Sequence, residues 1–316
     1  MVSRGSLKDR IKKSGKVFIV GVGGDSGAGK TTFVKGIIAM LGKDIVSSFS
    51  LDDYHTLDRK QRAEKKITPL NPDANNLEGL AKDLSDLKKG KPIMKPVYNH
   101  KDGSFGKPVL FKPTPVIIIE GLHPFYTEKL RKNIDLKIFV EPDREIKRKW
   151  KIRRDVEQRG HKVENVLKEM KLRAPDYEKY IDEQKIYADV IVQIAKSAFS
   201  EDDLYQIRLV QRRVAVPLEE MDLSLDLSAM LRLSDRNFAF EYQKDDYYGH
   251  DVGILSMDGE IHRSVVKNLE EKICGYAGKK GSSILPDGEE YISTREIAQL
   301  IISWRFMEKI SRLLKK

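Results

Sequence analysis

The feature that most constrains this chain is a glycine-rich loop set between an apolar run and a helical pattern. Residues 17–23 (VFIVGVG) form a short β-branched run that predicts a buried strand. The loop that follows, GDSGAGKT, matches the pattern G-x-x-x-x-G-K-[ST], and residues 30–41 carry a helical pattern. Such a loop can turn successive backbone N–H groups toward an anion, and the start of the helix adds its positive end. The sequence therefore predicts a phosphate-binding loop between a strand and a helix.

This loop predicts a site for a nucleoside triphosphate and a divalent cation. Lys30 is expected to reach the β- and γ-phosphates, and the hydroxyl of Thr31 is expected to ligate Mg²⁺. Glu120 ends the apolar run VIIIE, where such folds place a carboxylate that binds Mg²⁺ or its water; the alternative is a surface acid at a strand end. The residues expected to hold the nucleotide are Gly24, Asp25, Ser26, Gly27, Ala28, Gly29, Lys30, Thr31 and Thr32.

The rest of the chain divides into two patterns. Up to residue 195, strand-like runs at 45–51, 115–121, 135–141 and 189–194 alternate with helical patterns at 77–87, 143–173 and 176–186. This alternation predicts an α/β fold, a P-loop kinase type with a mostly parallel sheet flanked by helices. Residues 204–262 instead alternate apolar and polar positions in short runs, which predicts antiparallel strands that extend the sheet. We expect a core at 1–195 and a strand-rich extension with two closing helices at 196–316, the second opening with a Ser293–Glu296 capping box.

Composition narrows the classes of partner. The formal net charge is +10 with a pI near 9.3, which suits a polyanionic partner or, equally, a well-solvated lysine-rich surface. One cysteine, Cys274, excludes an internal disulfide and a cysteine metal site, and it predicts a reducing, cytoplasmic setting. The N-terminal stretch has no apolar core typical of a signal peptide, and no apolar run approaches the roughly 20 residues that cross a bilayer. We therefore expect no membrane partner.

The stretch SLDDYHTLDR (50–59) places two carboxylates, a histidine and an arginine within ten residues. Because it follows the strand at 45–51, Asp52 is expected to face the γ-phosphate and to take a proton from an attacking hydroxyl. Asp53 then becomes a capping or supporting residue, although it remains the alternative base. His55 and Arg59 are four residues apart, so on a helical turn they would share a face and favour an acceptor that already carries a phosphate. The competing interpretation is a solvated loop.

These motifs together resemble one family. The phosphate loop, SLDDYHTLDR, KPVYNH (95–100), IIEGLHPFY (118–126) and WKIRRDVEQRGH (150–161) occur in the order typical of phosphoribulokinases. They are most similar to the plant and cyanobacterial branch of the phosphoribulokinase/uridine kinase family. The similarity continues through LRAPDYEKYIDEQKIYADVIVQI (172–194) and is weaker at YYGHDVGILSMDG (247–259).

The resemblance implies roles for particular residues. It implies that Asp52 is the catalytic base, that His55 and Arg59 contact the sugar phosphate, and that Glu120 belongs to the metal site. Tyr98 and His100 match the acceptor-binding loop. The basic catalytic helix is matched by Lys151, Arg154, Asp155 and Arg159. Independently of the family, Lys151, Arg154 and Asp155 lie at i, i+3 and i+4, so one helix face can offer cations to a transferring phosphoryl group. Arg173 is a candidate for a lid over the nucleotide.

The chain departs from the family's thiol control. The plant and cyanobacterial enzymes are switched off by a disulfide between a cysteine in the phosphate loop and one before the Asp-Asp pair. Here those positions are Ala28 and Ser50, and the family's C-terminal cysteine pair is missing too, so that switch cannot form. In lacking it, the chain resembles archaeal members.

The resemblance predicts ATP- and Mg²⁺-dependent phosphorylation of the 1-hydroxyl of ribulose 5-phosphate by a homodimer. A uridine-kinase-like enzyme is the closest alternative, but His55, Arg59 and the basic helix suit a phosphorylated acceptor better than a neutral nucleoside. The alternative from another class is a nucleic-acid-binding protein that uses the +10 charge. No stacking-aromatic signature supports that alternative, so we expect no nucleic-acid partner.

Overall fold

The computed structural model describes residues 5–100, 102–200, 204–212, 236–279 and 284–315, and its chain divides into two compact units. The core unit contains residues 16–30 and 47–189, and the C-terminal unit contains residues 1–15, 31–46 and 190–316. The boundary predicted at 195/196 differs from this grouping, because residues 1–15 and 31–46 are grouped with the residues after 189. The division into domains 1–195 and 196–316 stays a prediction.

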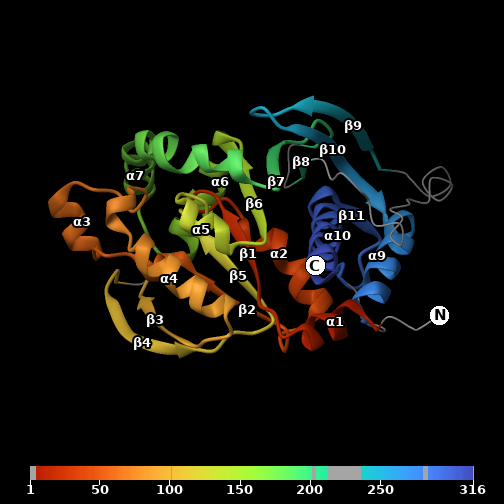
Figure 1. Ribbon diagram of the computed structural model, residues 1–316. Helices are drawn as coiled ribbons and strands as arrows, with labels where there is room; N and C mark the ends of the chain where they lie inside the picture. Colours follow the sequence, from red (N-terminus) through yellow and green to blue (C-terminus); the bar gives the residue numbers. More distant parts are fainter. Residues whose placement is uncertain (1–4, 101, 201–203, 213–235, 280–283, 316) are drawn as a thin grey trace. The chain divides into compact units, whose positions relative to one another are not determined.

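The core unit is built on a sheet with the strand order β6-β1-β5-β2 (Figure 1). Its strands are β1 (Phe18–Gly23), β2 (Val46–Ser50), β5 (Val116–Gly121) and β6 (Leu136–Pro142). β1 runs parallel to both β5 and β6 and is buried along its whole length. In the β1–β5 register Val22 lies beside Glu120, so both strands end at the same edge of the sheet. The run at 17–23, which the sequence predicted as a buried strand, is therefore a central strand.

Short helices and one hairpin complete the core unit. The helices are α3 (Arg59–Lys65), α4 (Leu77–Lys88), α5 (Glu128–Asn133), α6 (Arg144–Ile152) and α7 (Val163–Asp176), with 3₁₀ turns at Leu51–Tyr54, Pro72–Ala74 and Asp182–Tyr187. The hairpin joins β3 (Ile93–Tyr98) to β4 (Phe105–Phe111). The sequence did not predict this hairpin, because Pro96 interrupts the run and coincides with a register shift between Lys95 and Val97.

The basic stretch predicted as one helix at 143–173 is interrupted. After α6 the backbone widens into a π-helical segment at Arg153–Gln158, turns at Gly160 with φ +70°, and resumes as α7. A second π-helical segment, Tyr177–Ile181, follows α7 where a helix was predicted at 176–186. Such widened turns are frequent at functional sites. The first one carries Arg154 and Asp155.

The C-terminal unit contains antiparallel strands and long helices, as the alternating pattern predicted. β7 (Val190–Lys196) pairs with β8 (Tyr205–Arg212), and β10 (Asp251–His262) pairs with β8, β9 (Phe238–Asp246) and β11 (Tyr291–Ser293). Its helices are α1 (Leu7–Ser14), α2 (Lys30–Leu41), α9 (Arg263–Ala277) and α10 (Thr294–Lys315). One of the short alternating runs predicted within 204–262, AMLRLS (229–234), lies outside the described residues.

One contact shows how closely two of these helices pack, and another marks where α10 begins. A Cβ at Gly36 of α2 would come within 2.4 Å of the Ser303 hydroxyl, so glycine lets α2 and α10 approach closely. At the start of α10, Ser293 donates to the Glu296 carboxylate and accepts from the Arg295 amide at 3.3 Å. The predicted pair therefore meets at the helix start, although Ser293 itself closes β11. The mostly parallel sheet flanked by helices, with further antiparallel strands, is confirmed.

Candidate active site

The phosphate loop joins β1 to α2 and is shaped by three glycines with left-handed backbone. Gly24, Gly27 and Gly29 have φ of +142°, +83° and +79°. At Gly24 a Cβ would stand 2.5 Å from the carbonyl oxygen of Val140, so the first loop position has no room for a side chain. These conformations are open to glycine at little cost, which is why the motif requires it. The loop therefore has the backbone that an anion-binding turn needs.

The ammonium of Lys30 closes back on this loop. Its Nζ donates to the carbonyl oxygens of Gly24 at 3.1 Å and Asp25 at 2.8 Å. Burial lowers the pKa of Lys30, while the carboxylates of Asp52, Glu120 and Asp25 oppose that shift. Residues predicted separately from three parts of the sequence are thus close enough to act on one cation.

Asp25 anchors two further cations against the loop. Its carboxylate lies 3.1 Å from Lys147 Nζ and 3.6 Å from an Arg173 guanidinium nitrogen, and it accepts from the Ser26 amide at 2.7 Å. Burial alone would raise the pKa of Asp25, but Arg173 and Lys147 outweigh it and hold the pKa low. Arg173 of α7, the candidate lid residue, therefore reaches the phosphate loop. Lys147 was not singled out from the sequence.

Asp155 organises the predicted cations of the basic helix. Its buried carboxylate lies 2.8 Å from Arg154 Nε, 3.2 Å from Arg159 Nη1 and 3.3 Å from Lys151 Nζ. Arg154 also donates to the Ser26 hydroxyl at 3.2 Å. Burial alone would raise the pKa of Asp155, but the bond from Arg154 and the charge of Lys151 bring it to about 2. An acid held this firmly in its charged form orders the three cations.

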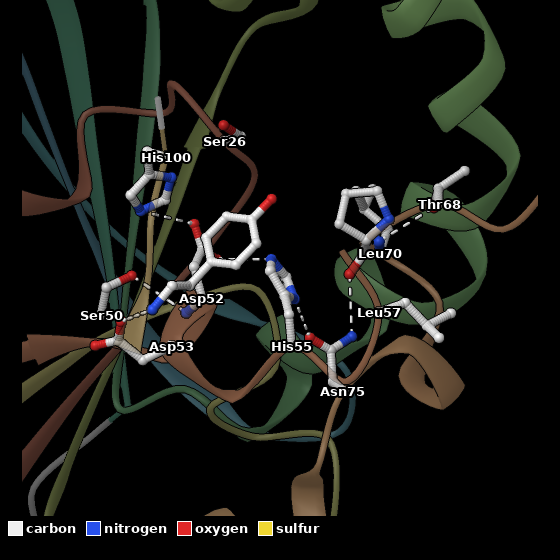
Figure 2. A network of polar contacts seen from close by, with 12 residues as sticks. Ser26, Ser50, Asp52, Asp53, His55, Leu57, Thr68, Leu70, Asn75 and His100 are labelled. Carbon is white, nitrogen blue, oxygen red and sulfur yellow. Dashed lines mark hydrogen bonds and ion pairs between the residues drawn. The ribbon is translucent and has the colours of Figure 1, made fainter. Parts of the chain in front are cut away.

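The two neighbouring aspartates of SLDDYHTLDR are held differently. Asp53 accepts from Lys95 Nζ and, at 2.9 Å, from the Tyr98 amide, so it ties the 3₁₀ turn to β3. Asp52 has a side chain that is 31% exposed, and its oxygens lie 3.8 Å from His55 Nε2 and 3.9 Å from His100 Nε2 (Figure 2). Its amide donates to Ser50 Oγ at 3.2 Å. Of the two carboxylates, only that of Asp52 is left facing side chains predicted to bind the acceptor.

The interpretation of His55 and Arg59 as neighbours on one helix face was wrong. His55 ends the 3₁₀ turn Leu51–Tyr54, and α3 begins only at Arg59 after the cap residue Asp58. Arg59 instead donates to the backbone carbonyl of His100 at 3.1 Å. Arg59 therefore reaches the acceptor loop through a tertiary contact and not through helical spacing.

Tyr98 is the packing centre of this loop. Its ring meets the rings of His55 and His100 edge-on, with centroid distances of 4.9 and 5.3 Å. Its hydroxyl accepts from Arg62 at 2.6 Å, and Arg62 also donates to the Leu57 carbonyl at 2.6 Å. Tyr98 thus spaces the two histidines, while its hydroxyl is bound by a buried arginine that the sequence reasoning missed.

Several other residues at this site were missed as well. Lys95 and Asn75 hold Asp53 and His55, respectively, and belong to distant stretches of the chain. His123 follows the Glu120 strand end and is buried; within the described residues neither of its ring nitrogens makes a hydrogen bond. Burial lowers the pKa of His123 to about 4. Its position directly after a strand end, within IIEGLHPFY, was the signal that could have pointed to it.

A divalent cation at this site would need ligand atoms from the substrate phosphates as well as from the protein. Among the described residues, no group of three or more acidic, histidine or cysteine side chains could hold a metal ion alone. Mg²⁺ in kinases is typically held by one or two protein groups plus substrate phosphates, so a complete cluster of protein ligands is not required. No helix within the described part of the chain is long and apolar enough to span a membrane.

Comparisons with known proteins agree with this geometry. Residues 19–198 match the Phosphoribulokinase / Uridine kinase family. A phosphoribulokinase of Synechocystis sp. is 36% identical over 269 residues, covering 82% of this chain and 80% of that protein. The chloroplastic phosphoribulokinase of Arabidopsis thaliana is 32% identical over 297 residues, covering 82% of this chain and 75% of that protein.

Two further comparisons concern the other branch of the family and the fold. A uridine kinase of Borreliella burgdorferi is 35% identical, but over only 55% of this chain and 85% of its own length. The solved phosphoribulokinase of Rhodobacter spheroides superposes with a TM-score of 0.55 at 18% identity, covering 76% of this chain and 90% of that one, and so supports the fold. On its sequence, its fold and its phosphate loop, the chain belongs to the phosphoribulokinase/uridine kinase family.

Proposed function

We propose that this protein is an ATP-dependent kinase that phosphorylates the 1-hydroxyl of ribulose 5-phosphate, giving ribulose 1,5-bisphosphate and ADP. The observation that carries the proposal is the extent of similarity. Phosphoribulokinases match 82% of the chain, whereas the uridine kinase match covers 55%. The acceptor, and not the nucleotide, distinguishes the two activities, so the longer match favours the sugar phosphate.

Asp52 would receive the proton of the acceptor. Its exposed carboxylate between His55 and His100 can accept from a sugar hydroxyl, and Asp53 is already bound on both oxygens. The hydroxyl oxygen attacks the γ-phosphorus, the bond from phosphorus to the bridging oxygen of ADP breaks, and the proton passes to Asp52. Lys30 and Arg154 would face the negative charge on the transferring group, with Lys151 and Arg159 held nearby by Asp155.

Mg²⁺, when bound with ATP, would neutralise charge on the β- and γ-phosphates. Thr31 and Glu120 are the side chains that would hold it, and residues 24–32 would hold the nucleotide. Arg59, beside the His100 carbonyl, would contact the sugar phosphate, with Tyr98 and His100 shaping the rest of the acceptor pocket. A homodimer is proposed on the same family resemblance, and a cytoplasmic setting on the single cysteine. Light scattering of the purified protein would test whether it is a dimer.

The decisive experiment measures ADP release with ribulose 5-phosphate, with uridine and with no acceptor, under identical Mg²⁺ and ATP. Turnover that depends on ribulose 5-phosphate supports the proposal, and turnover with uridine alone would replace it with a nucleoside kinase. The nucleic-acid alternative predicts RNA binding that weakens steeply with salt. Against this alternative, cations at the site are paired with carboxylates of the protein itself, as Lys147 and Arg173 are with Asp25.

A further inference from the structure

His55 is buried beside the proposed base and has one ring nitrogen already engaged. Its side chain is 4% exposed, and Nδ1 lies 2.7 Å from the side-chain oxygen of Asn75, while Nε2 faces Asp52 (Figure 2). A neutral imidazole carries one hydrogen on either of two nitrogens, and the partner of one nitrogen decides the role of the other. What Asn75 offers to Nδ1 therefore determines what His55 offers to a substrate.

The orientation of the Asn75 amide is set by the loop that precedes it. Its Nδ2 donates to the backbone carbonyls of Asn71 at 2.8 Å and Pro69 at 3.1 Å, which uses both of its hydrogens. A flipped amide would place its oxygen against two carbonyl oxygens. The amide oxygen therefore faces His55, and because it can only accept, Nδ1 must carry the hydrogen.

The surroundings of His55 keep the ring neutral. Burial lowers the pKa of His55, and Arg62 and His100 reinforce that shift; Asp52 and the bond to Asn75 oppose it. His123 also acts on it electrostatically, and the Tyr98 ring packs against it edge-on. In a neutral ring with hydrogen on Nδ1, Nε2 has only a lone pair to offer.

We propose that Asn75 is a positioning residue that holds His55 as the Nδ1–H tautomer, so that Nε2 accepts a hydrogen bond from a hydroxyl of the acceptor sugar. Nε2 and the nearer oxygen of Asp52 are both acceptors and lie 3.8 Å apart, too far for a hydrogen bond between them. The pair is thus complementary to two hydroxyl donors on one ligand, one at each acceptor. In ribulose 5-phosphate these would be the 1-hydroxyl at Asp52 and a second hydroxyl, not the carbonyl, at His55.

This inference rests on the proposed function for its substrate, and it gives His55 a different task from the phosphate contact that the family resemblance implied. A lone-pair acceptor repels phosphate oxygens, so His55 would select the sugar chain and leave the phosphate to Arg59. Asn75 would not touch the substrate. Its effect would pass through the ring of His55.

The test combines Asn75→Asp with ¹⁵N-histidine NMR of the free full-length protein, using His55→Gln to assign the His55 signals. In the wild-type protein at pH 7.5, we expect a neutral ring with hydrogen on Nδ1 and none on Nε2. A carboxylate at position 75 should still accept from Nδ1 and should also stabilise the charged ring, so the pKa of His55 should rise in the variant. Nε2 would then carry hydrogen and become a donor beside Asp52. The second carboxylate oxygen cannot make the two bonds to the Asn71 and Pro69 carbonyls, so the recovery of KM at high pH, and not the KM change alone, reports on His55.

The kinetic consequence is weaker binding of the acceptor, which a higher pH should reverse. At pH 7, Asn75→Asp should raise KM for ribulose 5-phosphate by about 10-fold, roughly the worth of one lost hydrogen bond. The defect should shrink as pH rises through the new pKa of His55, because deprotonation restores the lone pair. KM for ATP should change less than about twofold, since the phosphate loop is a separate site.

Asn71→Asp controls for the added charge, because it places a carboxylate in the same loop. Asn71 accepts from the Asp73 amide at 3.0 Å, which an aspartate can also do, and its backbone carbonyl remains available to Asn75. This variant should behave like wild type. The proposal is overturned if wild-type His55 carries its hydrogen on Nε2, or if folded Asn75→Asp has a normal KM for the sugar at pH 7. Should ribulose 5-phosphate support no turnover at all, the proposed function fails, while the wild-type NMR spectrum still decides the tautomer.

Discussion

Asp52 and Asp53 are adjacent in the chain, yet only one of their carboxylates is committed to the fold. Asp53 binds Lys95 and the Tyr98 amide, whereas Asp52 faces the ring nitrogens of His55 and His100 at 3.8 and 3.9 Å. A base must keep a lone pair for its substrate, so the same pair of residues supplies one structural acid and one available acceptor.

Asp52→Asn should lower kcat by roughly 100-fold or more, because an amide of the same shape cannot take a proton. ATP binding should change little, since the phosphate loop keeps its own backbone contacts. Steady-state kinetics and nucleotide titration would measure both effects. Near-normal turnover in this variant would remove Asp52 from the mechanism.

Replacing Lys95 by methionine should instead reduce stability. Lys95 and Asp53 have side chains only 11% and 14% exposed, so removing the ammonium leaves a nearly buried carboxylate without its cation. Losing one partner of a buried pair typically costs about 3–5 kcal/mol. Urea unfolding of Lys95→Met and of Lys95→Met/Asp53→Asn would measure the effect. The double variant should be the more stable of the two, and equal stabilities would contradict the buried pair.

Arg59→Ala should raise KM for ribulose 5-phosphate by about 10- to 100-fold, since charge-assisted hydrogen bonds to phosphate are worth roughly 1.5–3 kcal/mol each. Arg59→Lys should recover only part of the loss, because a point charge cannot make the bidentate contact. Lys60→Ala, an exposed neighbour on α3, is the control and should leave both KM values near normal. If Arg59→Ala raises KM for ATP and spares the sugar, the arginine serves the nucleotide.

The stability of the core unit should depend on Asp155 in acid. Its folded-state pKa of about 2 lies below the usual value of 3.8, so the charged form is stabilised by folding. This contribution, about 2 kcal/mol, is present in full above pH 4 and is lost as the pH falls through 2. Asp155→Asn should therefore lower the free energy of unfolding at pH 7 and flatten its dependence on pH below 4. If the free energies of unfolding of the two proteins fall in parallel below pH 4, the assignment is contradicted.

Cycling the protein between oxidant and dithiol should leave its activity nearly unchanged. Cys274 is the only cysteine in the chain, it is buried, and burial raises the pKa of its thiol, which keeps it from reacting as a thiolate. The measurement is the ADP assay after each treatment, with Cys274→Ala as the control. A large reversible loss that Cys274→Ala abolishes would indicate an intermolecular disulfide.

Local sequence carried enough information to predict the central strands and the phosphate loop. β1 and β5 are buried apolar runs with turns at their ends, and the loop between β1 and α2 has glycines where the backbone is left-handed. In each case the signal and the structure lie within a few residues of each other. The hairpin β3–β4 had no such signal, because Pro96 breaks the pattern at the point where the ladder shifts register.

The acceptor side of the site was less predictable, because its geometry comes from distant residues. His55 is held by Asn75, Asp53 by Lys95 and Tyr98 by Arg62, and these partners are 20, 42 and 36 positions apart in the sequence. No periodicity links such pairs. The burial that makes His55 neutral is likewise a tertiary property. The sequence could therefore suggest a histidine near the acceptor but could not say whether its ring is charged.

The inward-folded ammonium of Lys30 has a consequence for which anions the loop can retain. An ammonium has three N–H groups, and two of them already point at the carbonyls of Gly24 and Asp25. A small monoanion can engage the remaining hydrogen, but to gain more it must break bonds that already exist. A polyphosphate brings several oxygens at once, so it can replace both carbonyls while the backbone amides hold its other end. A ligand with several phosphate oxygens therefore gains the bonds of Lys30 and of the backbone amides together.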